Sequence, residues 1–255
     1  MNTPFKFDQS TKHGKFSGGF GVEILYPGLA LSRTDSGLGA IGKIDHASFH
    51  PGSIVPMHPH KDDEILTYMR SGEITHRDTV GHVETVTPQR LMLMNAGHTF
   101  KHEETIEPAG GKLKALQIFM RPREANLKPK VQFHDFGNAY SVDQWRLIAG
   151  PHDAPLILRA DASIYDTRLE AGETLALPQP PKGEIRQLLY VFEGEVTVAG
   201  HNLKTGESLL LDGHVHDVEA IKQSDLVLFV TDLDAPIFKG GLFSGNLFQT
   251  NNLRA

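Results

Sequence analysis

Short runs of alternating apolar and polar residues recur along this chain, with glycine and proline between them. Clear examples lie at residues 22–26, 41–49 and 112–120. A period of two is typical of a strand with one buried face, because successive side chains in a strand point to opposite sides. Frequent Gly and Pro between the runs favour turns over helices. The pattern therefore predicts an all-β protein.

One pair of runs predicts a β-hairpin. Residues 73–78 and 83–86 alternate around the turn-like residues 79–82. His76 and His82 belong to this segment, and we interpret both as solvated hairpin residues rather than metal ligands.

The second half of the chain repeats the first. Residues 67–75 (TYMRSGEIT) match residues 189–197 (LYVFEGEVT) without a gap. Between the halves, residues 121–130 contain two prolines and five charged side chains, a composition typical of a linker. We therefore expect two domains joined by a linker, with residues 1–120, 121–135 and 136–255 as the three parts. The first 20 residues are expected to form an arm laid on the surface or across the other half.

Four residues with metal-binding side chains stand at alternate positions in two short stretches. His58 and His60 are two residues apart, and so are His102 and Glu104, so each pair shares one face of an extended strand. Imidazole and carboxylate together suit a divalent transition metal, and this set leaves one or two coordination positions open for water, substrate or oxygen. Because the chain has 14 histidines, solvated loop histidines are the alternative for any single pair.

The surroundings of both pairs resemble known motifs. The spacing Gly52-x5-His58-x-His60-x3-Glu64-x7-Gly72 closely resembles the first cupin motif, and residues 88–102 resemble the second. The match is closer still to the pirin family. The segments similar to its signature and to its closing segment are residues 58–68 (HPHKDDEILTY), 72–73, 76–78, 235–237 and 241–243.

Pirins are two-cupin proteins whose N-terminal cupin holds iron. The resemblance therefore implies an all-β bicupin, two jelly-roll-like barrels packed together, with a metal in the N-terminal barrel on His58, His60, His102 and Glu104. Iron(II) is the ion that the family implies, and nickel, manganese, copper or zinc accept the same donors. Pro88-Gln89-Arg90 and Ala96-Gly97-His98-Thr99 depart from the family's usual Pro-Gly-Asp and Ala-Gly-x-Gly, so a loop near the metal is expected to differ in shape.

Glu64 and Glu104 compete for one role. Most cupins use the glutamate at the Glu64 position as a ligand, whereas the pirin resemblance implies the later one. A straight strand would place Glu64 roughly 13 Å from His60, so a turn over residues 61–63 must intervene. We rank Glu104 as the ligand, and Glu64 as a general base or as the group that orients a ligand histidine. Glu104 is the other candidate base, and a solvent-facing Glu64 at a strand edge is the alternative.

The second half carries no equivalent site. A gap-free projection places Pro180, Lys182 and Arg186 opposite His58, His60 and Glu64, and a second offset places Glu219 and Ile221 opposite His102 and Glu104. We therefore expect a structural or partner-binding half. His214 and His216 form another His-x-His pair, which we do not expect to bind metal.

Composition narrows the function classes. The net charge is −6 with no long basic run, which argues against a direct nucleic-acid binder. The absence of cysteine excludes disulfides and thiolate metal sites. No segment approaches the ~20 apolar residues of a membrane helix, and the N-terminus lacks the apolar core of a signal peptide. We therefore expect a cytoplasmic protein that does not bind membranes.

Two functions follow from the resemblance. Bacterial pirins that act as quercetin 2,3-dioxygenases bind a flavonol at the metal and use O2 to open its heterocycle with loss of carbon monoxide. We expect this activity, on quercetin or another small aromatic compound, with Met92, Met94 and Phe100 either lining the mouth or forming ordinary core. The alternative is a non-catalytic, metal-containing regulator that binds a transcription factor or an enzyme. Sugar isomerisation is a weaker third reading, carried by the cupin fold alone.

Overall fold

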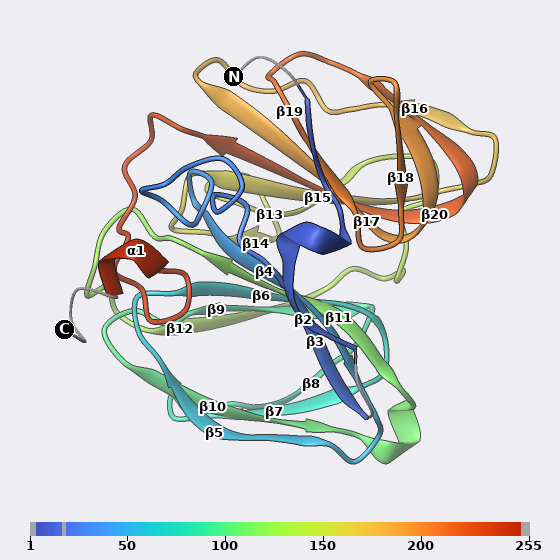
Figure 1. Ribbon diagram of the computed structural model, residues 1–255. Coiled ribbons are helices and arrows are strands. Elements are labelled where there is room, and N and C mark those ends of the chain that lie inside the picture. Colours follow the sequence, from blue (N-terminus) through green and yellow to red (C-terminus); the bar gives the residue numbers. More distant parts are fainter. Residues whose placement is uncertain (1–3, 17–18, 251–255) are drawn as a thin grey trace.

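The computed structural model describes residues 4–16 and 19–250, and strands make up most of its regular structure. Two β-rich domains lie one above the other in Figure 1, with the first half of the chain mostly below and the second half above. No helix in the described ranges is long and apolar enough to cross a membrane. The all-β prediction is confirmed.

The N-terminal domain consists of two antiparallel sheets. Its strands are β2 (Lys12–Lys15), β3 (Phe20–Leu25), β4 (Ile41–Phe49), β5 (Ile54–His60), β6 (Glu64–Ser71), β7 (Ile74–Asp78), β8 (Val83–Val86), β9 (Arg90–Asn95), β10 (Phe100–Ile106), β11 (Leu113–Met120) and β12 (Lys130–Asp135). One sheet has the order β12–β9–β6–β11–β4–β3–β2, and the other has the order β5–β10–β7–β8. Two short 3-10 turns accompany the N-terminal half, η1 (Gln9–Thr11) and η2 (Pro108–Gly110).

The C-terminal domain is a single nine-stranded sheet. Its strands are β1 (Phe5–Phe7), β13 (Arg146–Gly150), β14 (Leu156–Ile157), β15 (Ala162–Leu169), β16 (Thr174–Ala176), β17 (Ile185–Val198), β18 (His201–Lys204), β19 (Ser208–Leu211) and β20 (Asp217–Asp232). The main path is β1–β19–β17–β20–β15–β13–β14, while β16 pairs with β20 and β18 with β17. The long strands β17 and β20 each take the place of two strands of the first domain and wrap the sheet around its own apolar core.

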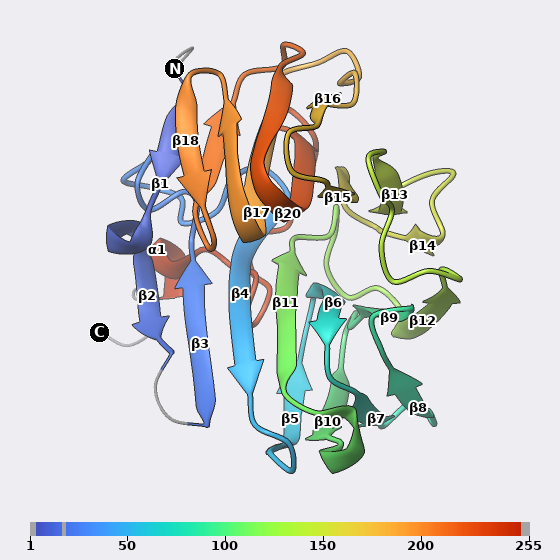
Figure 2. The ribbon, with the colours of Figure 1, turned by 90° about the vertical axis from the view of Figure 1, so that its right-hand side faces the viewer.

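The burial of each strand follows its sequence pattern. In β10, Phe100, His102, Glu104 and Ile106 are buried while the residues between them are more exposed, as strict alternation predicts. Strand β6 is buried along almost its whole length, because one face lines the N-terminal barrel and the other meets the second domain. Figure 2 shows β3, β4 and β11 side by side, rising toward β17 and β20.

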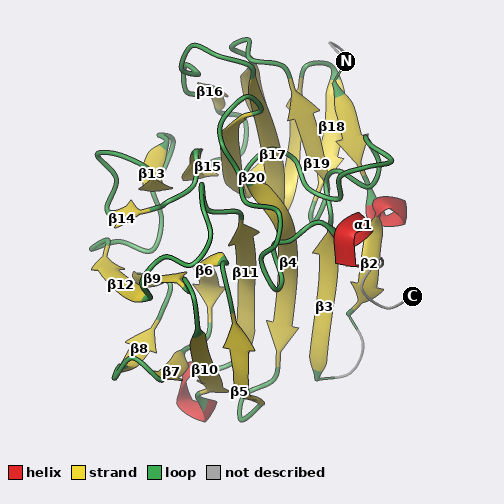
Figure 3. Cartoon of the chain, turned by 90° about the vertical axis from the view of Figure 1, so that its left-hand side faces the viewer, coloured by secondary structure: helices red, strands yellow, loops and turns green. Residues whose placement is uncertain are grey.

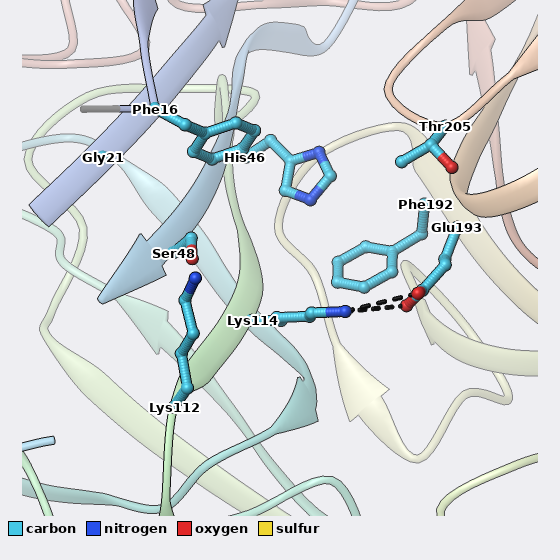
Figure 4. A pocket seen from close by; sticks show the side chains of 9 residues that line it. All are labelled: Phe16, Gly21, His46, Ser48, Lys112, Lys114, Phe192, Glu193 and Thr205. Carbon is cyan, nitrogen blue, oxygen red and sulfur yellow. Dashed lines mark hydrogen bonds and ion pairs between the residues drawn. The ribbon is translucent and has the colours of Figure 1, made fainter. Parts of the chain in front are cut away.

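The two domains share one core. Tyr68 of the first domain and Phe192 of the second are both fully buried in the same apolar cluster. Tyr68 Oη and Arg70 Nη2 both bond Asp166 Oδ2 at 3.0 Å across the interface. At the side of this interface is a hollow of about 310 Å3, where Lys114 of β11 pairs with Glu193 of β17 (Figure 4).

The predicted arm and linker both take part in sheets. Phe5–Phe7 pairs with β19 of the C-terminal domain, whereas Lys12–Lys15 pairs with β3 of the N-terminal domain, so the described part of the arm joins both domains. The predicted linker at residues 121–135 is corrected in its last six residues, which form β12 and pair with β9. Val131 and Phe133 pack against the first domain's core and give this segment its strand character. The predicted hairpin is confirmed as β7 and β8, with Arg77 opposite Val83.

After β20 the chain returns to the N-terminal domain and reaches the helix α1 (Leu247–Thr250) beside it (Figures 1 and 3). Leu242 N donates to the Lys61 carbonyl at 2.9 Å. Ser244 donates to Asp63 Oδ1 from its backbone nitrogen and from its hydroxyl, both at 2.8 Å. The tail is therefore fastened to the turn that separates His60 from Glu64.

Candidate metal centre

Three histidines converge where β5 and β10 lie side by side. Register places His58 directly opposite His102, and His60 lies two residues further along β5. The three Nε2 atoms are 3.0 to 3.1 Å from one another. Three nitrogens this close together could all bind one divalent ion at the ~2.1 Å typical of a metal–imidazole bond. Imidazole nitrogens are the donors that such ions accept, so the residues fit a metal.

Each ligand ring has an acceptor on its opposite side. His58 Nδ1 lies 2.9 Å from the Pro56 carbonyl, and His60 Nδ1 lies 3.4 Å from Asp63 Oδ2. His102 Nδ1 lies 3.4 Å from Nδ1 of His76. When each Nδ1 carries the proton, each Nε2 presents its lone pair to the shared point, which is the tautomer that a metal requires.

His76 is a correction to the hairpin interpretation. It is fully buried, and its Nε2 lies 2.9 Å from Asp78 Oδ2. Asp78 is itself fixed, because its Oδ1 accepts from the backbone nitrogens of Val80, Gly81 and His82. A signal was present in the sequence, since His76 shares its strand face with the apolar Ile74 and that face lines the barrel. His82 remains partly exposed, as expected.

Glu104 is buried next to His102 and is held by another residue. Gln117 Nε2 lies 3.2 and 3.0 Å from its two carboxylate oxygens. Glu104 Oε1 lies 3.7 Å from His102 Nδ1. The carboxylate of Glu104 is clustered with His76 and His102 rather than with the three converging Nε2 atoms. The structure thus brings three of the four predicted ligands together, and ligation by Glu104 stays a prediction.

Burial shifts the pKa values of the ligand histidines and of Glu104 in opposite directions. Desolvation holds the pKa of His102 well below its usual range, and repulsion from neighbouring histidines lowers it further. Desolvation also lowers the pKa of His58. Both rings are therefore neutral at neutral pH. Desolvation raises the pKa of Glu104 to about 7, against the bond from Gln117. This carboxyl consequently titrates near physiological pH in the metal-free protein.

Glu64 is a second correction, because it lies at the domain interface. Arg159 bonds its carboxylate from Nε at 3.0 Å and from the backbone nitrogen at 2.9 Å, and Asn95 Nδ2 donates a third bond. Burial raises the pKa of Glu64 against these donors. The carboxylate that reaches a ligand histidine is Asp63, one residue earlier. Glu64 is not a solvent-facing group at a strand edge either.

Aromatic residues cover His60, and sequence reasoning missed them. The Phe243 ring lies 4.8 Å from the His60 ring and Phe119 lies 6.0 Å from it, measured between centroids. Lys43 Nζ lies 4.1 Å from the Phe119 centroid. Met92 and Met94 are fully buried core residues, as one of the two readings proposed.

Comparisons with known proteins identify the families and relatives that this chain resembles. The family model described as pirin matches residues 39–120, and the model described as quercetinase C-terminal cupin domain matches residues 147–231. The chain is 30% identical over 185 residues to a pirin-like protein of Caulobacter vibrioides, covering 70% of this chain and 77% of that protein. It is 28% identical over 194 residues to the quercetin 2,3-dioxygenase of Escherichia coli K12, covering 76% and 83%.

A solved structure has the same fold as this chain. The bacterial pirin YhhW from Escherichia coli, in complex with nickel(II), aligns with a TM-score of 0.77 at 24% identity, over 90% of this chain and 99% of that chain. The predicted all-β bicupin is confirmed. Two family models match this chain, and it is 30% identical to the pirin-like protein of Caulobacter vibrioides over 77% of that protein. The chain therefore belongs to the pirin family.

Proposed function

We propose that the chain is a metal-dependent dioxygenase that acts on a flavonol such as quercetin or on a related small aromatic compound. The observation that carries the proposal is the convergence of three Nε2 atoms on one point, each ring already oriented from its other side. Relatives named quercetin 2,3-dioxygenase support the substrate class. Iron(II) is the proposed ion, and the nickel(II) complex of a structural neighbour keeps nickel as the alternative.

A divalent ion on the three imidazoles would act as a Lewis acid toward a substrate hydroxyl and supply the redox centre for O2. Asp63 and His76 hold the ligand rings of His60 and His102 in the required orientation. Phe119 and Phe243 shield His60, and Phe243, which is 37% exposed, offers apolar surface to a flat ring.

Glu104 is proposed as the base. Burial raises the pKa of this carboxyl to about 7 in the metal-free protein, so its surroundings favour a group that can accept a proton. It would take the proton of the substrate hydroxyl, and the opened ring would leave with both oxygen atoms of O2 while one carbon departs as carbon monoxide. If Glu104 instead turns away from Gln117 to ligate the ion, this proton must pass to another acceptor.

The test combines metal content with turnover. Protein purified without added metal should contain about one transition ion per chain and bleach quercetin in air, and His60→Ala should lose both. His152→Ala is the matched control, because His152 is an exposed histidine of the other domain. Bleaching no faster than that of free metal in buffer would contradict the dioxygenase. A stable protein complex from cell extract, formed only with metal-loaded protein, would then favour the regulator.

A further inference from the structure

The hollow at the side of the domain interface lies on the opposite side of the sheet from the metal centre (Figure 4). Its wall includes His46 of β4, which pairs with Leu116 of β11. The next residue of β11, Gln117, holds Glu104 inside the barrel. Because successive side chains of a strand point to opposite sides, His46 points away from the barrel interior. The volume of about 310 Å3 is near the lower end of the range for small-molecule sites.

His46 presents a hydrogen-bond donor to this hollow. Lys12 Nζ donates to Tyr190 Oη at 3.3 Å, so the tyrosine hydroxyl keeps its own proton for His46 Nδ1, which lies 3.0 Å away. An imidazole that accepts at Nδ1 carries its proton on Nε2. Burial, reinforced by the positive charges of Lys12 and Lys114, lowers the pKa of His46 to about 3 and keeps the ring neutral. Nε2 has no hydrogen-bond partner among residues 4–16 and 19–250.

Two more donors beside it are unpaired. The side chains of Ser48 and Lys112 make no hydrogen bond or ion pair with any residue that the structure describes. Gly21 lies opposite Ser48 on β3 and has no side chain to cover its hydroxyl. Lys114, in contrast, is neutralised by Glu193 at 3.1 Å. The hollow thus combines three free donors with one uncompensated positive charge, which suits a ligand with a single negative charge.

The placement of these donors fits the two oxygens of a carboxylate. His46 and Ser48 are neighbours on one face of β4, roughly 6.7 Å apart along the strand. A carboxylate between them can accept one hydrogen bond of roughly 2.9 Å on each oxygen. Figure 4 shows Lys112 reaching toward Ser48, while Lys114 points across the hollow to Glu193. Lys112 is therefore the lysine that can add its charge to the pair of donors.

Aromatic rings form the apolar part of the hollow. Phe192 stacks on the His46 ring at 4.8 Å between centroids, and Phe16 meets the same ring edge-on at 5.4 Å. Phe192 is fully buried, whereas Phe16 is 47% exposed. Aromatic pairs gain energy beyond the burial of their area, in offset or edge-on arrangements. A flat ring attached to the carboxylate would therefore cover Phe16 and replace its contact with water.

We propose that this hollow binds a small aromatic carboxylate, with the carboxylate on His46, Ser48 and Lys112 and the ring against Phe16. The site needs no metal, because none of the residues that line it belongs to the candidate metal centre. It is therefore separate from the site of the proposed dioxygenase reaction.

The test titrates the full-length protein, with and without zinc, with benzoate, benzyl alcohol and acetate, following backbone amide NMR signals. Benzoate should shift the amides of residues 46–48, 112–114 and 192–193. It should bind at least about 10-fold more tightly than benzyl alcohol, because hydrogen bonds to a charged group are the stronger ones. Acetate should bind more weakly than benzoate, because it has no ring to pack on Phe16. Zinc should leave the affinity for benzoate unchanged.

Three variants separate the charge from the ring. Lys112→Gln should weaken benzoate about 10-fold and leave benzyl alcohol unchanged. Lys101→Gln is the matched control, because Lys101 is an exposed lysine of the same domain that lies outside the hollow. Phe16→Ala should weaken benzoate and benzyl alcohol by the same factor and leave acetate unchanged. Lys112 and Phe16 are both exposed, so neither substitution threatens the fold.

Three outcomes would each overturn the proposal. These are equal binding of benzoate and benzyl alcohol, equal losses in Lys112→Gln and Lys101→Gln, and amide shifts confined to other regions. Binding of benzoate only in the presence of zinc would place it at the metal and would count against the hollow as well. Because the titration measures binding without turnover, its failure leaves the dioxygenase standing, and loss of quercetin bleaching leaves this site standing.

Discussion

The two cupins of this chain use the same succession of strands, but they fill their barrels with different chemistry. His76 and Val198 stand at equal distances after Gly72 and Gly194 in the repeat. His76 lies opposite Glu104 on β10, and Val198 lies opposite Val218 on β20. Two polar residues of the metal centre are thus replaced by an apolar pair in the core of the second barrel.

The same register corrects the projected alignment of the second half. Glu219 and Ile221, the residues projected onto His102 and Glu104, are exposed on the outer face of β20. By strand pairing the inner positions are His216 and Val218. Glu104 follows Met94 by ten positions, whereas Val218 follows the aligned Leu211 by only seven. A gap-free offset carried past this turn is therefore wrong by an odd number of residues and selects the wrong face of the strand. The conclusion stands, because within the described ranges the groups that could hold a metal both lie in the first domain.

This contrast shows which polar residues the fold needs. The second domain closes and packs with Val198 and Val218 at the positions of His76 and Glu104. The polar groups inside the first barrel therefore lower its stability unless a ligand compensates for them. Replacing these polar residues with their C-terminal counterparts should therefore weaken ligand binding without preventing folding.

The largest effect is expected on metal affinity. His102→Ala removes a converging nitrogen and should weaken metal binding by more than about 100-fold, since loss of a group that only orients a ligand already costs 10- to 100-fold. His216→Ala, at the matching place in the second domain, should leave affinity unchanged. Competition with a chelator of known affinity measures both. An equal loss in the two variants would mean that the second cupin also contributes to binding.

The fold was largely readable from the sequence, and the centre only in part. Alternation placed the strands and put His58 and His60 on one face, because a strand fixes which side chains share a face. The resemblance to the cupin motifs implied that His102 joins them. Which carboxylate reaches His60 was not readable. Asp62 in the turn has a φ of +53°, and this single backbone choice turns Asp63 toward His60 and Glu64 toward Arg159. Phe243 arrives from the far end of the chain, beyond any local pattern.

A pH-dependent stability difference is expected next. Glu104 has a pKa of about 7 in the fold against an ordinary value of 4.5, so folding favours its protonated form. Below about pH 4.5 the carboxyl is protonated in both states and carries no ionisation cost, and the cost grows as pH rises to about 7, reaching about 3 kcal/mol. In metal-free protein, Glu104→Gln should therefore gain about this much stability over wild type at pH 8 and nothing at pH 4.

Urea unfolding at both pH values, in the presence of a chelator, measures the difference. Glu219→Gln is the control, because Glu219 is exposed on the second domain. A gain that is the same at pH 4 and pH 8 would show that the carboxyl does not titrate as described.

A smaller effect should follow from His76→Val, which installs the residue of the second cupin. Without His76, His102 Nδ1 loses the ring that orients it, and metal affinity should fall roughly 10- to 100-fold. His82→Val is the matched control, since His82 also bonds Asp78 but has no contact with His102. Cobalt-loaded protein provides a second readout, because its visible spectrum should change in His76→Val and not in His82→Val. Identical spectra and affinities in the two variants would remove His76 from the centre.

The smallest effect is expected at Thr67, which has a hydroxyl where the second half of the repeat has Leu189. Thr67 Oγ1 is buried without a partner, so Thr67→Val removes an unsatisfied group while keeping the shape of the side chain. The ligand-free variant should be more stable than wild type by about 1 kcal/mol in urea unfolding. Thr105→Val should change stability by less, because Thr105 is partly exposed. A variant that is less stable without ligand would mean that the hydroxyl already has a partner within the fold.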